Sequence, residues 1–389
     1  MKILHQAGHN TSWNIQSLRD GIGDGIIVSA VHEKFDRVCQ IEHDIRAVSL
    51  FDPQFYVPDS PKPKLATYNF FPSALLDEFS TVDYAMVAAE AAHKCIEFQI
   101  NQDFDSIIVP SRFYPDLVPG YANLQKIFSV DAFLRVIAAS RTNKRIFVTL
   151  PVTSSMISGD NHTYRNHILN WITSYPQISG VYLVNSFMES TKQIMSYDKL
   201  MAHMTLIHDL KSANLDVIVG YCNTEAVLLS ICDPFAVTMG AYENTRTFTI
   251  DKFYDNDEER RGPAPRIYFP RLLNWMRWQT AVEIRQDYPD VWSLIYEPTR
   301  YAEELFGAAT SVHFTKPHLY KHHFELMNGQ LARLASVHHI ERIPAVQSLI
   351  NTAVQLYRTI QGAGVTFVDD NCSGAHLSVW NRVIRNWKP

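Results

Sequence analysis

The sequence predicts an α/β fold, a (β/α)8 TIM-type barrel with a C-terminal helical extension. Short, continuously apolar segments alternate with amphipathic segments of helical spacing through the first two thirds of the chain, which is typical of βαβ units around a buried parallel sheet. Seven or eight such units favour a closed barrel over an open sheet. With 389 residues, of which 46% are hydrophobic, the chain is long enough for a barrel core and an appendage.

The predicted strands follow one another at the intervals that a barrel requires. They are 25–31, 47–52, 105–111, 145–151, 180–186, 216–221 and 235–242. Amphipathic helices are expected between most of them, for example in DYAMVAAEAAHKCIEFQI and YDKLMAHMTLIHDLKSA. The eighth strand is the least distinct, and RIYF at 266–269 is the candidate.

The last third of the chain has helical spacing without a strand of comparable strength. We therefore expect a barrel domain over residues 1–275 and a helical extension over 276–389 that packs on it. No window contains the roughly 18 uninterrupted apolar residues of a membrane span, and the N-terminus lacks the pattern of a secretory signal. The sequence thus predicts a cytoplasmic protein without a membrane partner.

The cysteines and histidines do not form a recognisable metal motif. The five cysteines lie far apart without a CxxC pair, which argues against a disulfide framework and a cysteine-built zinc site. His318 and His322 have i, i+4 spacing near other histidines, but no acidic or cysteine cluster completes a ligand set. We expect no metal and no cofactor.

In barrels of this type, the side chains that follow the strands build the active site. This rule selects a set of polar residues at the predicted strand ends: Asp52, Gln54, Arg112, Thr153, Asn185, Ser186, Glu189, Asn223, Glu225, Tyr242 and Glu243. Asp52 and Glu243 are the candidate catalytic pair, because two carboxylates across a barrel mouth suit cleavage at a sugar carbon that develops positive charge. The alternatives are a capping role for Asp52 and a salt bridge from Glu243 to Arg246.

Basic and aromatic residues are mixed in three segments near the C-terminal end, ERRGPAPRIYFPRLLNWMRW, KPHLYKHH and VWNRVIRNWK. Such a mixture can hold phosphates and stack bases. Amphipathic helices with arginines that extend to solvent explain it equally well. The net charge of −5 excludes a generally basic nucleic-acid coat, so any such contact must be local.

Four segments resemble the tRNA-guanine transglycosylase superfamily, barrel enzymes that break a nucleobase N-glycosidic bond. They are SLFDPQFYVP, GVYLVNSFMES, VGYCNTEAVLLSICDPFAVTMGAYENTR and KPHLYKHHFELMNGQLARLASVHHI, and they occur in the family's order over residues 45–340. The resemblance places Asp52 at a functional family aspartate, with Gln54 and Phe55 beside the base pocket. It also places Glu189 close to a family glutamate.

The chain departs from the family at two points. The zinc cysteines are missing where this sequence has SVHFTKPH, and the nucleophilic aspartate of the family falls at Ala236 and Val237. Neither alanine nor valine can form a covalent sugar intermediate, whereas attack by activated water does not need that nucleophile. The resemblance therefore implies a divergent, zinc-less member that excises a base and leaves an abasic site.

In that scheme Asp52 activates water or stabilises the sugar cation, and Glu243 assists at the leaving base. The base and its neighbouring groups would be held by a second set of residues: Gln54, Phe55, Arg112, Asn185, Ser186, Glu189, Tyr242 and Arg246. The expected partner is nucleic acid, with DNA favoured over tRNA, and the base would be flipped out or supplied in a single strand. Excision of a modified base from invading phage DNA is one biological setting for this activity.

Three alternatives remain open from the sequence. The first is a transglycosylase that exchanges one base for another in tRNA or DNA. The second is a non-catalytic, nucleic-acid-binding barrel, which the missing nucleophile and zinc ligands permit. The third is an unrelated barrel hydrolase or lyase that acts on a small phosphorylated or sugar substrate.

Overall fold

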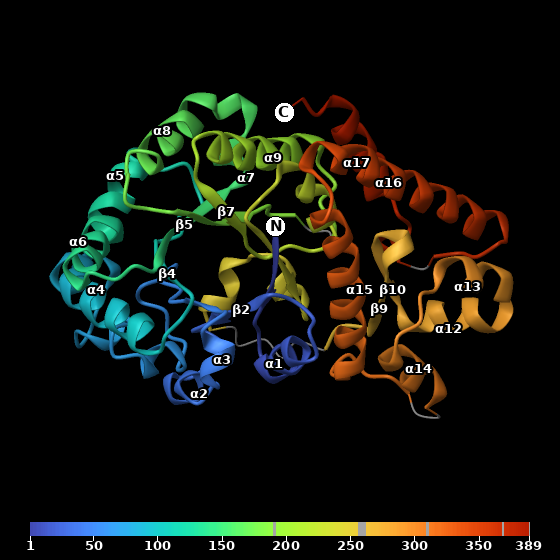
Figure 1. The fold of residues 1–389 in the computed structure, drawn as a ribbon, viewed down its shortest axis with the longest axis horizontal. Coiled ribbons are helices and arrows are strands. Elements are labelled where there is room, and N and C mark those ends of the chain that lie inside the picture. The colour runs from blue at the N-terminus through green and yellow to red at the C-terminus, as the bar shows by residue number, and fades with distance from the viewer. Residues whose placement is uncertain (190–191, 256–261, 309–310, 368, 389) are drawn as a thin grey trace.

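The computed structural model describes residues 1–189, 192–255, 262–308, 311–367 and 369–388. Within these ranges the parallel strands form one sheet in the order β3-β2-β1-β8-β7-β6-β5-β4. Their bounds are β1 Lys2–Gln6, β2 Gly25–Ser29, β3 Leu50–Asp52, β4 Ser106–Val109, β5 Arg145–Thr153, β6 Gly180–Ser186, β7 Asp216–Val219 and β8 Ala236–Gly240. This eight-stranded, nearly closed barrel confirms the predicted fold class (Figure 1).

The barrel closes between β3 and β4. The ladders of the other strands are continuous, from Ser29 beside Asp52 to Val109 beside Val148. At the closing seam the backbone N–H of Asp105 donates to the carbonyl of Ser49 over 2.9 Å. The strand residues are almost all buried because the barrel interior and the surrounding helices cover both faces.

The eighth strand of the barrel is β1, and the prediction of that strand at 266–269 was wrong. β1 pairs with both β2 and β8, so it occupies the centre of the sheet order. RIYF instead forms β9 Arg266–Phe269, which pairs antiparallel with β10 Asn274–Arg277 in a separate hairpin. The sequence of β1, KILHQ, is short and ends in two polar residues, so its apolar signal is weak.

Helices lie around the sheet between successive strands (Figure 1). They are α1 Thr11–Arg19, α2 Phe35–Cys39, α3 His43–Arg46, α4 Tyr84–Asn101, α5 Tyr121–Gln125, α6 Asp131–Ser140, α7 Ser154–Ile157, α8 His162–Ile172, α9 Tyr197–Ser212 and α10 Ala226–Leu229. Long helices such as α4 and α9 bury their apolar stripe and expose the opposite side. Burial of that stripe is what fixes each helix on the sheet.

The chain after β8 contributes both to the barrel and to a lobe beside it. Its helices are α11 Glu243–Arg246, α12 Trp278–Asp287, α13 Pro289–Ile295, α14 Arg300–Gly307, α15 Pro317–Ala335, α16 His339–Gly362 and α17 His376–Asn386. Helix α15 packs against β1 and α1, and the ring of Phe324 lies 4.7 Å from that of His5. Thus α15, from beyond residue 276, covers the barrel where β8 and β1 meet, while α12–α14 form the outer lobe (Figure 1).

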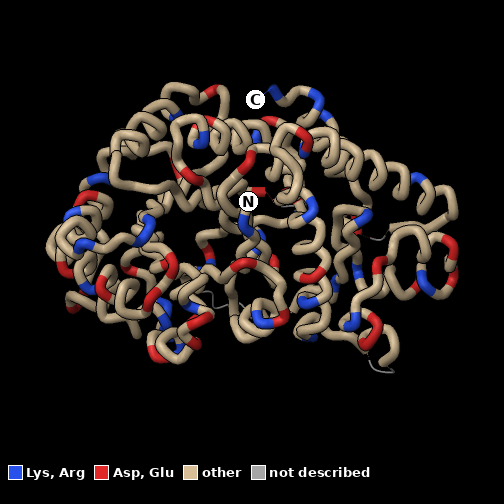
Figure 2. The backbone as a smooth tube through the Cα atoms, viewed as in Figure 1, with Lys and Arg blue, Asp and Glu red and all other residues tan. Residues whose placement is uncertain are grey.

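Basic and acidic residues are interspersed over the barrel and the lobe in this view (Figure 2). Within the described ranges, no helix is long and apolar enough to cross a membrane. Part of the basic segment ERRG, residues 259–261, lies outside the described residues.

Candidate active site

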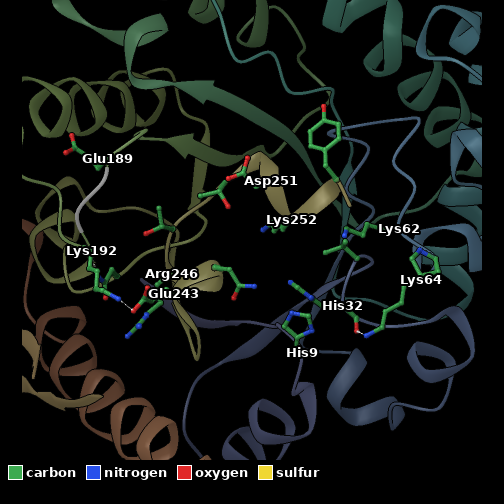
Figure 3. A pocket seen from close by; sticks show the side chains of 17 residues that line it. His9, His32, Lys62, Lys64, Glu189, Lys192, Glu243, Arg246, Asp251 and Lys252 are labelled. Atoms are coloured by element: carbon green, nitrogen blue, oxygen red, sulfur yellow. Dashed lines mark hydrogen bonds and ion pairs between the residues drawn. The ribbon is translucent and has the colours of Figure 1, made fainter. Parts of the chain in front are cut away.

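A cleft of about 810 Å³ opens at the carboxyl end of the barrel strands. Loops after β1, β2, β3, β6, β7 and β8 supply its lining: His9, Val31, His32, Lys62, Pro63, Lys64, Glu189, Lys192, Asn223, Glu243, Asn244, Arg246, Thr247, Thr249, Asp251, Lys252 and Tyr254. Lys192, Glu243 and Arg246 lie toward one side, Lys62 and Lys64 toward the other, with Lys252 between them (Figure 3). This is the end of the barrel at which enzymes of this fold place their chemistry.

The loop after β8 supplies much of the cleft because it folds back against the end of its own strand. A side chain at Gly240 would overlap the backbone and the hydroxyl of Thr245, so only glycine allows this close return. The Thr245 hydroxyl donates to the carbonyl of Tyr242 over 2.7 Å and fixes the turn. The return presents Glu243 and Arg246 to the cleft from the short helix α11.

Arg246 is a buried cation with unused hydrogen-bond donors. Its side chain is 6% exposed, and its guanidinium lies 3.8 Å from the ring centroid of Trp275. Nε and Nη1 have no hydrogen-bond partner among the described residues. Burial lowers the pKa of Arg246 to about 10, so the group stays charged at neutral pH. Buried donors of this kind are usually satisfied, and Arg246 lines a cleft that can admit an anion.

Lys252 is a second buried nitrogen without a partner. Its Nζ is buried, has no hydrogen-bond partner in the described chain, and lies 3.8 Å from the ring centroid of Tyr221. Burial lowers the pKa of Lys252 from 10.5 to about 7, although the charge of Asp52 acts in the opposite direction. A large share of the amine is therefore neutral at pH 7.

Asp52 ends β3 and lies behind the cleft wall rather than in the cleft. It is 1% exposed, and its carboxyl accepts hydrogen bonds of 3.1 Å from the Tyr56 hydroxyl and from the backbone N–H of Gln54. Burial raises the pKa of Asp52 to about 7 despite these bonds and the nearby charge of Lys252. Asp52 and Lys252 are thus electrostatic partners beneath the cleft.

His32 adds a third unpartnered group. It is 3% exposed, and neither ring nitrogen has a hydrogen-bond partner in the part of the chain that is described. Its ring lies 4.4 Å from that of His9, and its backbone carbonyl accepts from Lys64 Nζ over 2.5 Å. Burial, together with the charges of Lys252, His9 and Lys64, holds the pKa of His32 well below its ordinary value. His32 is therefore a neutral imidazole that can bind a ligand as donor or acceptor.

Glu243 is a partly exposed carboxylate of the cleft, which Glu189 and Asp251 also line. Its side chain is 43% exposed and forms an ion pair with Lys192, rather than the expected one with Arg246. Burial acts to raise the pKa of Glu243, but the hydrogen bond from Lys192 and the charges of Arg246, Lys192 and Arg266 outweigh it and hold the pKa below its ordinary value. Glu243 is therefore ionised at neutral pH.

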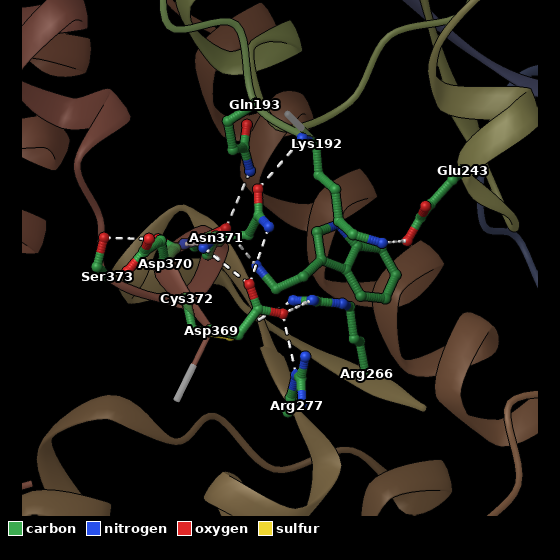
Figure 4. A network of polar contacts seen from close by, with 12 residues as sticks. Lys192, Gln193, Glu243, Arg266, Arg277, Asp369, Asp370, Asn371, Cys372 and Ser373 are labelled. Atoms are coloured by element: carbon green, nitrogen blue, oxygen red, sulfur yellow. Dashed lines mark hydrogen bonds and ion pairs between the residues drawn. The ribbon is translucent and has the colours of Figure 1, made fainter. Parts of the chain in front are cut away.

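The loop that carries Lys192 is held by polar contacts with other parts of the chain. The carbonyl of Lys192 accepts from Asn223 Nδ2 over 2.7 Å, and its N–H donates to Asn371 Oδ1 over 3.3 Å. Asn371 lies beside Asp369, which forms ion pairs with Arg266 and Arg277 (Figure 4). Residues 369–373 and the β9–β10 hairpin thus hold one wall of the cleft.

The structure brings together only some of the predicted site residues. Glu189, Glu243 and Arg246 line the cleft, and Tyr242 lines an adjoining pocket of about 640 Å³ that shares Glu243 and Arg246. Glu189 is held by an ion pair of 2.9 Å with Lys199.

The other predicted residues are engaged elsewhere. Gln54 accepts from the N–H of Val31 and donates to the Tyr221 hydroxyl. Asn185 bonds to His203, Phe55 packs on Phe71 and Phe133, Ser186 is 6% exposed, and Arg112 lies 4.9 Å from the ring of Tyr114. These residues, like Asp52, do not line the cleft.

Several cleft residues were missed: His9, His32, Lys62, Lys64, Lys192 and Lys252. The strand-end rule should have selected His32, because it follows the predicted strand at 25–31 directly. His9 was missed because the strand before it, β1, was not predicted. The lysines lie well beyond the strand ends, where spacing along the chain gives no signal.

No cluster of three or more His, Cys, Asp or Glu side chains in the described ranges could hold a metal ion. His318 pairs with Glu304, and His322 bonds to Thr299 and to the carbonyl of Tyr268.

No protein-family model matches the chain, and no curated protein sequence matches it. Among solved structures, the chain is similar to a dihydrodipicolinate synthase from Oceanobacillus iheyensis, with 10% sequence identity and a TM-score of 0.27 over 98% of this chain and 95% of that one. A likeness at this TM-score carries no information on function. The resemblance to tRNA-guanine transglycosylases stays a prediction from the motifs.

Proposed function

We propose that this protein is an enzyme that binds a phosphate-bearing nucleoside unit in the barrel-mouth cleft and cleaves its N-glycosidic bond. One observation carries the proposal. Arg246, Lys252 and His32 line the same cleft, and each has buried nitrogen atoms without hydrogen-bond partners within the described residues. Buried polar groups without partners are costly, and they are retained where a ligand satisfies them.

Arg246 is the centre of the anion site in this proposal. Its free Nε and Nη1 donors suit two oxygens of a phosphate, because the guanidinium fork matches that geometry. Lys62 and Lys64 lie on the other side of the cleft, where they favour an anionic ligand. The sugar would lie between these cations, next to Glu243.

Glu243 is the group that faces the developing charge. Cleavage breaks the bond between the sugar C1 and the base nitrogen and builds positive charge on the sugar ring, which an ionised carboxylate stabilises. Water then supplies hydroxide to C1 and a proton to the departing base. The lowered pKa of Glu243 suits this electrostatic role better than proton donation to the base. Asp52 acts indirectly, through the charge state of Lys252.

A second groove, between α16 and α17, supports a polynucleotide substrate. Its volume is about 830 Å³, and its described lining includes Arg358, Arg382 and Arg385 but no acidic side chain. Arg382 stacks over Tyr197 at a distance of 4.0 Å, at the start of α9. Helix α9 follows the loop of Lys192 along the chain. Arginines near an aromatic ring can hold the phosphates of a flanking strand.

The test is release of free base from single- and double-stranded DNA, with normal and modified bases, and from tRNA. We expect wild-type protein to leave alkali-labile abasic sites, with DNA favoured over tRNA. Glu243→Gln should lower the rate by about 10²-fold or more, because one preorganised electrostatic group contributes on that scale. Glu304→Gln is the matched control and should keep the wild-type rate, because Glu304 lies on α14 in an exposed pair with His318.

Two results would change the proposal. Incorporation of labelled base without abasic sites would replace excision by base exchange. Tight binding of every nucleic acid without any base release or exchange would leave a binding protein and remove the enzymatic proposal.

A further inference from the structure

Lys252 has the environment of a reactive amine. It belongs to the 3-10 turn Ile250–Phe253, and its side chain reaches from the cleft lining toward the rings of Tyr221, Phe248 and Phe253, at 3.8, 5.1 and 5.5 Å from Nζ. In the described structure no carboxylate lies within ion-pair distance of Nζ, and no acceptor binds it.

Burial, rather than the charges around it, favours the neutral amine of Lys252. His9 and His32 lie on the loops after β1 and β2, and both interact electrostatically with Lys252. Lys64, on the loop after β3, adds a positive charge to the same group. The charge of Asp52 acts in the opposite direction and raises the pKa of Lys252. Burial lowers the pKa of Lys252 to about 7, so the nucleophilic form is well populated at neutral pH.

We propose that Lys252 is a nucleophile that forms an imine with the carbonyl carbon of a phosphate-bearing aldehyde or ketone in the cleft. Nζ adds to the carbonyl carbon to give a carbinolamine. The former carbonyl oxygen then leaves as water, taking both protons that the amine gave up. Arg246, with its free donors in the same cleft, would hold the phosphate.

Two sources supply this carbonyl chemistry. One is the ring-opened sugar at an abasic site, which is the product of the proposed function and rests on it. The other is a small phosphorylated aldehyde or ketone, which is independent of it.

The experiment uses pyridoxal 5′-phosphate, an aldehyde with a phosphate, followed by borohydride reduction and peptide mapping by mass spectrometry. We expect a stable adduct on Lys252, lost in Lys252→Met and retained in Lys126→Met, an exposed lysine outside the cleft. The rate of adduct formation should have its midpoint near pH 7. At pH 7 an amine with this pKa is about a thousandfold richer in its neutral form than an ordinary lysine. Pyridoxal without the phosphate should react more slowly.

A second arm separates the two sources. An oligonucleotide with a preformed abasic site is incubated with the protein and borohydride. A cross-link through Lys252 identifies the sugar aldehyde of the abasic site as the substrate. If Lys252 forms an adduct with pyridoxal 5′-phosphate but no cross-link to the oligonucleotide, the substrate is a small carbonyl compound. Labelling spread over surface lysines, equal in wild-type protein and a folded Lys252→Met variant, overturns the imine. Base release without any trapped adduct overturns it as well, while leaving the N-glycosidic proposal intact.

Discussion

Replacement of Arg246 by methionine should weaken anion binding while leaving the fold in place. The guanidinium lies 3.8 Å from the ring centroid of Trp275 and has two donors without partners in the described chain. A hydrogen bond between an ionised group and its partner contributes about 1.5–3 kcal/mol. Loss of this group should therefore raise the Kd for inorganic pyrophosphate by roughly 10- to 150-fold.

The effect of Arg246→Met on stability has two contributions that oppose each other. Each of the two unsatisfied buried donors costs about 1–3 kcal/mol, and methionine removes both costs. The lost contact with Trp275 stabilises the native state by about 2 kcal/mol when it is desolvated. We therefore expect the free energy of unfolding to stay the same or to rise by up to about 4 kcal/mol.

Calorimetric titration with pyrophosphate and thermal denaturation measure the two quantities separately. Arg135→Met is the matched control, because Arg135 is exposed on α6 and its loss changes the net charge equally. Equal affinities of the two folded variants for pyrophosphate would refute the assignment of Arg246 as the anion site. Unfolding of Arg246→Met alone would show instead that the guanidinium has a structural role.

Three further predictions concern ionisation. Lys192→Met removes the hydrogen bond and the charge that lower the pKa of Glu243. The acid limb of the pH profile for base release should therefore move to higher pH. An unchanged acid limb would show that Glu243 is not the ionised group. Asp52→Asn removes the charge that raises the pKa of Lys252, so the midpoint of pyridoxal 5′-phosphate labelling should fall below pH 7, and a rise would contradict the assigned coupling. Burial lowers the pKa of His376 to about 4, so between pH 6.5 and pH 4 the folded state binds fewer protons than the unfolded state. The stability that is present above pH 6.5 is therefore lost as the pH falls through this range. Chemical denaturation at several pH values should show that His376→Gln loses less stability over this window, by up to about 1.4 kcal/mol per pH unit, and equal slopes would contradict this sign.

The sequence by itself determined the fold class. Parallel strands that are covered on both faces must be continuously apolar, and this local signal located the strands from β2 to β8. It failed for β1, because the last residues of that strand, His5 and Gln6, are polar yet fully buried. The partner of Gln6, the hydroxyl of Tyr182, lies 176 residues away along the chain. The partners of His5, the carbonyl of Ile22 and the side chain of Asn14, lie outside the strand, so none of these contacts marks the local pattern.

The strand-end rule located part of the site, because the predicted strands gave the positions at which the chain enters the barrel mouth. Glu243 closely follows β8, so its position at the barrel mouth is a consequence of the strand register, whereas Arg246 was not among the residues that the rule selected. Asp52 also ends a strand, but its carboxyl turns inward to Tyr56 and Gln54 and is covered. The rule gives the end of the barrel on which a residue lies, and it does not give the direction of its side chain.

Only the tertiary structure decided which groups act together. Lys192 meets Glu243 across 51 residues, and Nζ of Lys252, which follows β8, lies over Tyr221, which follows β7. The pKa values of Lys252 and Asp52 depend on burial, which barrel closure produces and which no local pattern records. Residue types and strand periods are properties of short segments, whereas desolvation and charge pairing arise from contacts between loops that the closed barrel brings to one mouth.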